Sequence, residues 1–155
     1  MDIKLVSYSS KYQKAFKSLN EWWVEKYFNM EAMDHFYLDH PQKNIIDPGG
    51  YIAIALLNDE PVGACALVKM KSGAFDYELA KMGVSPKAHG KGIGFSLGQN
   101  IIEKARALGA KNIFLESNTK LEPAIKLYRK LGFEEIEGIE TPYDRCNIQM
   151  VLVLE

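Results

Sequence analysis

A short glycine-rich segment has the composition of a phosphate-binding loop. Between an apolar, strand-like stretch and a long amphipathic stretch lie His89, Gly90, Lys91, Gly92, Ile93 and Gly94. Glycines at alternate positions let the backbone turn so that its N–H groups point inward. A helix that follows such a loop adds unpaired N–H donors and the positive end of its dipole. We therefore expect this loop to hold a pyrophosphate group.

Two common glycine-rich loops do not fit these residues. A Walker loop requires Gly-Lys followed by Ser or Thr, whereas Lys91 is followed by Gly92. A dinucleotide fingerprint, Gly-x-Gly-x-x-Gly, would need its third glycine at Phe95 or at Leu97. Both motifs are therefore excluded.

The composition limits the kinds of partner. The chain has 155 residues, a formal net charge of -1 and two cysteines, Cys65 and Cys146. This length predicts one domain, residues 1–155, and the balanced charge gives no general attraction to nucleic acid or to an anionic membrane. The sequence begins without a basic and apolar leader, and neither a membrane-spanning apolar run nor a zinc or disulfide pattern of cysteines is found in it. We expect a cytoplasmic protein.

Hydrophobic periodicity and turn residues predict a mixed α/β fold. A strand over residues 3–8 precedes two helices over 11–27 and 31–40, the second ended by Pro41. Turn residues then separate strands over 51–57, 62–70 and 75–84 into an antiparallel meander that leads into the glycine loop. The loop opens a helix to about residue 108, followed by a strand over 112–116, a helix over 121–131 and strands over 133–136 and 146–154. This order differs from the strict alternation of a fully parallel sheet.

Two segments carry a resemblance to a known family. The glycine loop resembles the Gln/Arg-x-x-Gly-x-Gly/Ala coenzyme A signature of the GNAT superfamily, the acyl-CoA-dependent N-acetyltransferases, with His89 where Gln or Arg is usual. Residues 123–133 resemble that family's second signature, Ala-x-x-x-Tyr-x-x-x-Gly-Phe, through Ala124, Tyr128, Gly132 and Phe133. The two segments occur in the family's order, and the resemblance covers most of the chain.

The resemblance implies both a fold and an activity. The fold would be a central mixed, mostly antiparallel sheet of about seven strands, splayed between the fourth and fifth, with about four flanking helices. The activity would be transfer of an acetyl group from acetyl-CoA to a primary amine of a small molecule or peptide, by direct attack in a ternary complex and without a metal ion. A homodimer is the default expectation for a small enzyme. The alternative is a non-catalytic acyl-CoA-binding module with a regulatory or interaction role.

The same resemblance implies where the coenzyme lies. Its arm would lie between the splayed strands and bond to the backbone around Met82 and Val84, while residues 89–94 hold the phosphates mainly through backbone N–H groups. Gly83, inside an apolar strand, indicates a bulge or a close backbone approach.

The sequence leaves two alternatives for each side chain that could contact the coenzyme. The family's usual asparagine near the pantetheine arm is Leu121 here, so Asn118 just upstream either takes over its contact or does not. Lys87, His89 and Lys91 either neutralise phosphate or are solvated surface residues.

Acetyl transfer needs a base for the amine and an acid for the departing thiolate. Glu78 lies in an apolar strand, and its spacing to the glycine loop resembles that of the base in histone-acetylating members of the family. The alternative is that it pairs with a lysine on a neighbouring strand. Tyr128 matches the tyrosine with which the family often protonates the thiolate, the alternative being a core tyrosine with a satisfied hydroxyl.

The region that would bind the amine acceptor is rich in aromatic residues. Their helical spacing is equally explained if they belong to the hydrophobic core. In similar proteins this region walls the acceptor site, and here it contains Trp22, Trp23, Tyr27, Phe28, Phe36 and Tyr37. Arg145 follows Tyr143 on the last turn and either binds a substrate carboxylate or pairs with a neighbouring acid.

Overall fold

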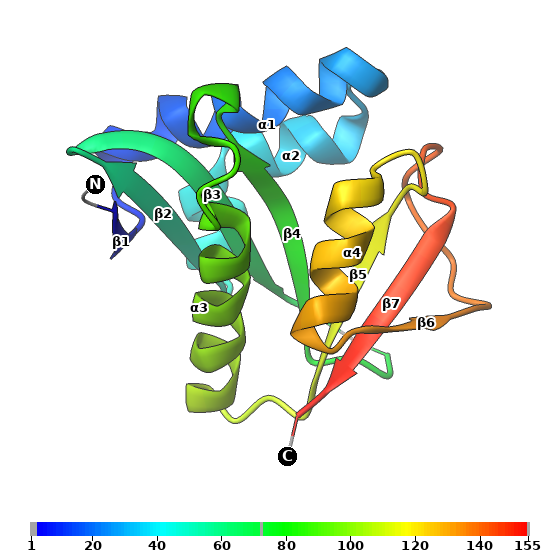
Figure 1. The fold of residues 1–155 in the computed structure, drawn as a ribbon. Helices are drawn as coiled ribbons and strands as arrows, with labels where there is room; N and C mark the ends of the chain where they lie inside the picture. The colour runs from blue at the N-terminus through cyan, green and yellow to red at the C-terminus, as the bar shows by residue number, and fades with distance from the viewer. Residues whose placement is uncertain (1–2, 72, 155) are drawn as a thin grey trace.

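A mixed seven-stranded sheet forms the centre of the molecule (Figure 1), and its strands follow the order β1-β2-β3-β4-β5-β7-β6. The computed structural model describes residues 3–71 and 73–154. Within these residues neighbouring strands are antiparallel except for β4 and β5, which are parallel. The strands are β1 (Ile3–Ser7), β2 (Tyr51–Leu57), β3 (Glu60–Lys69), β4 (Tyr77–Val84), β5 (Asn112–Ser117), β6 (Glu134–Ile136) and β7 (Ile148–Val153).

Four α-helices cover the two faces of the sheet in the described part of the chain. On one face α1 (Gln13–Tyr27) and α2 (Ala32–Asp39) pack over a buried cluster that includes Ile52 and Ile54. On the other face α3 (Ile93–Ala107) and α4 (Glu122–Leu131) pack over a cluster that includes Ala53 and Ala55. The clusters take alternate residues of β2 because successive side chains of a strand point to opposite faces. The predicted sheet of about seven strands with about four flanking helices is confirmed.

The sheet is splayed between β4 and β5, as Figure 1 shows. These strands pair only at Tyr77 with Ile113 and at Glu78 with Phe114. Beyond Glu78 the two strands diverge, although β4 still pairs with β3 and β5 still pairs with β7. One edge of β4 therefore presents backbone N–H and C=O groups without a neighbouring strand.

A β-bulge in β4 reverses the direction of one charged side chain. Lys81 and Met82 together lie opposite Cys65 of β3, and Lys81 has a φ of 54°. Regular alternation would place Lys81 on the same face as Leu79, beneath α3. The extra residue turns it toward α2 instead, where its ammonium group contacts Asp34.

Gly83 is required by a close backbone approach rather than by the bulge itself. A Cβ atom at this position would lie 2.8 Å from the carbonyl oxygen of Leu19 in α1. The bulge lies just before Gly83, so the sequence identified the region correctly, and the glycine allows α1 to pack directly on β4.

Two boundaries differ from the prediction for physical reasons. Pro41 was expected only to end a helix, but a π-helical turn, Gln42–Ile46, follows it. Proline disfavours helical angles at the residue before it, here His40 with φ -137° and ψ 60°, while its own fixed φ suits the first residue of a new turn. The last strand begins at Ile148 and not at Cys146, because Cys146 still belongs to a turn in which its N–H donates to the Tyr143 carbonyl oxygen.

Candidate active site

A cavity of about 690 Å³ occupies the opening between β4 and β5. Its walls come from α1, β4, the glycine loop, the start of α3, the end of β5, α4 and the turn before β7. The structure thus brings together ten of the eleven residues singled out as catalytic or coenzyme-binding. They are Glu78, Met82, Val84, His89, Gly90, Gly92, Ile93, Gly94, Asn118 and Tyr128; Lys91 does not line the cavity.

The glycine loop leaves room for an anion beside unpaired donors. Gly90 and Gly92 have φ values of 79° and 73°, and a Cβ atom added to either would meet nothing within 4 Å. The first hydrogen bond inside α3 runs from the Ser96 N–H to the Gly92 carbonyl oxygen, so the N–H groups before Ser96 have no intrahelical acceptor. Open space, free N–H groups and the positive end of a helix together fit a pyrophosphate.

Side chains near the loop are largely committed to other contacts. Lys87 forms an ion pair with Glu60 on β3. The His89 Nε2 atom lies 3.0 Å from the carbonyl oxygen of Val84, and the His89 ring contacts the Trp22 ring edge-to-face at 6.1 Å between centroids. These contacts hold the loop against β4 and α1. The backbone N–H groups are therefore the main hydrogen-bond donors that the loop leaves free.

Asn118 holds the end of β5 against the turn before β7. Its Nδ2 atom donates to the carbonyl oxygen of Arg145 at 2.6 Å, and its Oδ1 atom accepts from the Lys120 N–H at 2.8 Å. The side chain lines the cavity, but both of its polar atoms already have partners. These two hydrogen bonds fix the Asn118 side chain at the rim of the cavity.

Glu78 lies at the point where β4 and β5 separate. Its side chain lines the cavity, is largely buried and forms no ion pair with any residue in 3–71 or 73–154. Burial raises the pKa of this carboxyl group to about 7, with repulsion from Glu116 adding to the increase and the charge of Lys81 opposing it. A carboxyl group with a pKa near neutrality has the properties of a general base.

Tyr128 projects from α4 into the same cavity. It is 8% exposed, and its ring packs edge-to-face against Phe133 with centroids 6.2 Å apart. Burial, and secondarily the neighbouring Cys65, raises the pKa of its hydroxyl group, which stays protonated across the physiological range. Glu78 and Tyr128 thus approach the cavity from β4 and α4, on either side of the opening.

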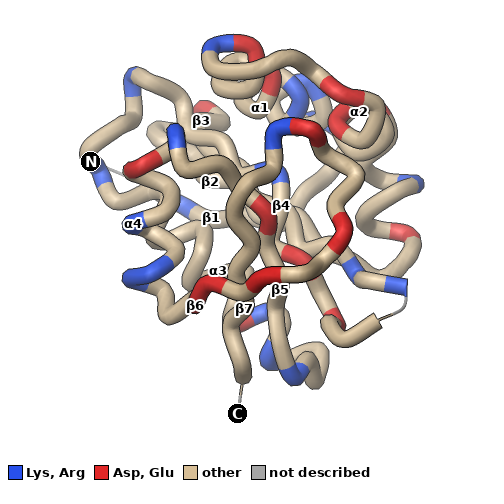
Figure 2. Tube along the Cα trace, turned by 90° about the vertical axis from the view of Figure 1, so that its right-hand side faces the viewer, with Lys and Arg blue, Asp and Glu red and all other residues tan. Residues whose placement is uncertain are grey.

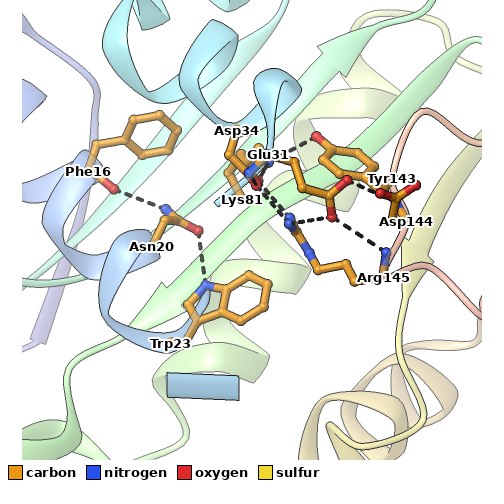
Figure 3. A network of polar contacts seen from close by, with 9 residues as sticks. All are labelled: Phe16, Asn20, Trp23, Glu31, Asp34, Lys81, Tyr143, Asp144 and Arg145. Carbon is orange, nitrogen blue, oxygen red and sulfur yellow. Dashed lines mark hydrogen bonds and ion pairs between the residues drawn. The ribbon is translucent and has the colours of Figure 1, made fainter. Parts of the chain in front are cut away.

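A network of charged side chains, which the sequence did not reveal, ties α2 to β4 and to the turn before β7 (Figure 3). Asp34, fully buried on α2, accepts from Lys81 Nζ at 2.6 Å and from both terminal nitrogens of Arg145 at 2.6 and 2.7 Å. Lys81 also donates to the Tyr143 hydroxyl at 3.0 Å, and Arg145 to Glu31 at 3.2 Å. Burial alone would raise the pKa of Asp34, but its bonds to Arg145 and Lys81 lower it to about 2. Arg145 is therefore committed to an internal pair.

Most of the aromatic residues named from the N-terminal helices line the cavity, whereas Tyr37 packs against a core cluster. Four of the six named from the sequence line the cavity, namely Trp22, Trp23, Tyr27 and Phe28, whereas Phe36 and Tyr37 do not. Trp23 is oriented by Asn20, whose Oδ1 atom accepts from the indole N–H at 3.2 Å (Figure 3). These side chains form one wall of the cavity.

The described residues contain neither a metal-binding cluster nor a helix that could cross a membrane. In ranges 3–71 and 73–154 no three His, Cys, Asp or Glu side chains are placed to hold a metal ion together. Among the helices in these ranges, none combines the length and apolarity that crossing a membrane requires.

Comparison with known sequences agrees with the geometry. Residues 16–133 match the model of the Acetyltransferase (GNAT) family. The chain is 34% identical over 117 residues to the uncharacterized N-acetyltransferase YjgM of Escherichia coli (strain K12). The matched segment covers 74% of this chain and 70% of that protein.

Solved structures share the fold at lower identity. An acetyltransferase of the GNAT family from Staphylococcus aureus Mu50 superposes with a TM-score of 0.89 at 20% identity, covering 99% of this chain and 100% of that one. A putative acetyltransferase, yncA of Salmonella typhimurium, solved with acetyl-CoA, gives a TM-score of 0.79 at 16% identity, covering 100% of this chain and 95% of that one. With its two signatures meeting at one splayed cavity, the chain belongs to the GNAT family of acetyltransferases.

Proposed function

We propose that this protein transfers an acetyl group from acetyl-CoA to a primary amine within a ternary complex. The observation that carries the proposal is that the unpaired edge of β4, the glycine loop, Glu78 and Tyr128 all line one cavity. Binding groups and proton-transfer groups then surround a single reaction centre. The acetyl-CoA bound to the structurally similar yncA protein supports the choice of co-substrate.

The cavity fits coenzyme A in two places. The N–H groups from His89 to Gly94 would hold the diphosphate, where the open space beside Gly90 and Gly92 leaves room for it. The amides of the pantetheine arm would bond to the free edge of β4 around Met82 and Val84, as an added strand does. Both contacts use the backbone, so they tolerate His89 where the family usually has Gln or Arg.

Glu78 would remove the proton that the amine must lose, either directly or through a water molecule. A protonated amine loses two protons overall as the C–N bond forms and the C–S bond breaks. One proton reaches the sulfur atom, and the other passes through Glu78 to solvent. With a pKa of about 7, Glu78 is both ionised and basic near neutral pH.

Tyr128 would return a proton to the departing sulfur atom. Burial raises the pKa of its hydroxyl and also that of the neighbouring Cys65 thiol, so the same apolar surroundings would raise the pKa of the coenzyme thiol. The pKa of the acid and the pKa of the leaving thiol would therefore be raised together.

The two cysteines are poor candidates for a nucleophile. The pKa values of both Cys65 and Cys146 are raised, mainly by burial, and neither is a good nucleophile. Direct transfer requires no covalent acetyl-enzyme.

A panel of amines with acetyl-CoA, monitored by release of free thiol, tests this function. Enzymatic turnover with any amine of the panel supports the proposal. Tight coenzyme binding without thiol release in the presence of small-molecule or peptide amines would favour a non-catalytic acyl-CoA-binding module instead.

Coenzyme affinity should depend on the space beside Gly92. Gly92→Glu puts a side chain and a negative charge where the pyrophosphate would lie, so calorimetry should detect no coenzyme A binding. Gly109→Glu is the matched control, because Gly109 has a similar φ of 81° and open surroundings but lies outside the cavity. Unchanged affinity in a folded Gly92→Glu protein would contradict the assigned site.

Removal of the Tyr128 hydroxyl should slow the chemical step. Tyr128→Phe keeps the ring packing on Phe133 but removes the proton donor, so turnover should fall about a hundredfold with little change in acetyl-CoA affinity. Tyr77→Phe, at another buried tyrosine that lies outside the cavity, is the control. Single-turnover measurements isolate the acetyl-transfer step, and an unchanged rate there would exclude Tyr128 as the acid.

A further inference from the structure

The positive charges deepest in the acceptor side of the cavity are already neutralised. Lys81 and Arg145 both line the cavity, and both are bound to Asp34 at 2.6 Å. Arg145 also pairs with Glu31 at 3.2 Å (Figure 3). Two carboxylates thus offset two cations, and the network as a whole carries no net charge. It offers no free cation to anchor an acidic acceptor.

Two other carboxylates of the cavity have no such compensation. Glu78 and Glu116 line the cavity from β4 and β5, and neither forms an ion pair in the described ranges 3–71 and 73–154. The Oε1 atom of Glu116 accepts from the amide of Gln149 at 2.9 Å, and the same amide donates to the Ile139 carbonyl oxygen. Because Gln149 is a neutral and buried partner, it fixes the position of Glu116 without cancelling its charge.

The segment leading to this side of the cavity is acidic as well. Residues 134–144 contain five acidic residues and neither lysine nor arginine. Figure 2 shows these positions recurring along β6 and the chain that follows it toward α2. A surface with one sign of charge beside a cleft attracts ligands of the opposite sign and raises their rate of association.

We propose that the acetyl acceptor is an aliphatic diamine or longer polyamine, whose second ammonium group is bound by Glu116 while Glu78 receives the proton of the reacting amine. This inference rests on the proposed acetyl transfer. Two uncompensated carboxylates inside one cavity match two positive charges held a few bonds apart. A protein lysine side chain brings only one charge to the reacting end, so a small dication fits better than a peptide.

The remaining lysines of the cavity lie at its exposed rim. Lys26 stacks over the Trp22 ring at 5.0 Å, and Trp22 contacts His89 of the glycine loop. Lys120 stacks over the Phe28 ring at 5.5 Å. Both lysine side chains are exposed, so solvent and salt screen their charges more than those of Glu78 and Glu116.

Steady-state kinetics with paired amines test the inference. The amines are 1,4-diaminobutane, the equally long monoamine 1-aminobutane, an amino acid and a lysine-containing peptide, with thiol release as the readout. We expect the wild-type protein to favour the diamine over the monoamine in kcat/KM by about tenfold or more. In Glu116→Gln this ratio should fall by about tenfold or more, toward one, mainly through KM, because one charged contact is lost.

A pH profile tests whether the charge of Glu116 acts on Glu78. Repulsion from Glu116 adds to the raised pKa of Glu78, so Glu116→Gln should shift the acid limb of kcat/KM to lower pH. Glu103→Gln, at an exposed glutamate of α3, is the control and should change neither the amine ratio nor the profile.

Several outcomes would overturn the inference. One is a wild-type preference for the monoamine, the amino acid or the peptide; another is an equal loss for diamine and monoamine in Glu116→Gln. Failure to release thiol with every amine of the panel would instead reject the proposed acetyl transfer itself.

Discussion

Glu78→Gln should lower turnover about a hundredfold or more while leaving coenzyme A affinity unchanged. The amide is nearly isosteric with the carboxylate but cannot accept the proton of the amine. In the wild-type protein kcat/KM should rise with pH through the Glu78 pKa of about 7, because only the ionised carboxylate is a base. The variant should lose this limb, so its deficit is expected to grow as the pH rises through about 7 and to be smallest at low pH, where the wild-type carboxyl group is protonated as well.

The control for this prediction is Glu103→Gln, at an exposed glutamate of α3 outside the cavity. It should retain the wild-type pH profile and turnover. Parallel profiles for Glu78→Gln and the wild-type protein would remove Glu78 from the mechanism and leave solvent as the base.

The same substitution should stabilise the fold at alkaline pH. Because the folded-state pKa of Glu78 is raised from 4.5 to about 7, the native state holds a proton that the unfolded chain has already lost in this range. Wild-type stability therefore decreases as pH rises from about 4.5 to about 7. Glu78→Gln removes this cost, and denaturant unfolding at pH 8 should show a gain of about 1 to 2 kcal/mol, allowing for the partly exposed side chain.

Asp34→Ala should destabilise the protein by about 3 to 5 kcal/mol, which is the usual cost of breaking a buried ion pair from one side. Lys81 would lose its anionic partner in a site where it is only 8% exposed, and Arg145 would lose its bidentate partner. Urea unfolding measures the loss. The difference in the free energy of unfolding between the wild-type protein and Asp34→Ala should decrease below pH 3.8. In this range Asp34 becomes protonated as the pH falls toward its folded-state pKa of about 2.

Two further variants test the cause of this loss. Glu103→Ala breaks an exposed ion pair with Arg106 and should cost at most about 1 kcal/mol. Asp34→Ala combined with Lys81→Met removes the stranded charge and should recover part of the stability. Equal losses in the single and double variants would contradict a penalty that arises from unpaired Lys81.

Local interactions made much of this protein predictable from its sequence. Helical and strand periodicities, Pro41 and the capping glycines involve residues a few positions apart, so the element order and most boundaries could be predicted. The glycine loop could be identified for the same reason, since its φ values, its free N–H groups and the start of α3 are properties of consecutive residues. The order of the two signatures then indicated the fold and the positions of Glu78 and Tyr128.

Tertiary structure alone decided the environment of those residues. Asp34 meets Lys81 across 47 positions and Arg145 across 111, and no local pattern specifies such pairs. The bulge at Lys81 depends on how β3 and β4 pair, and it reversed the direction that simple alternation assigns to this side chain. Likewise, the contact of Glu78 with the cavity and its proximity to Glu116 exist because β4 and β5 separate after one short region of pairing. The sequence determined which ionisable groups the chain carries near the glycine loop, whereas the packing of distant strands and helices decided which of their charges remain uncompensated.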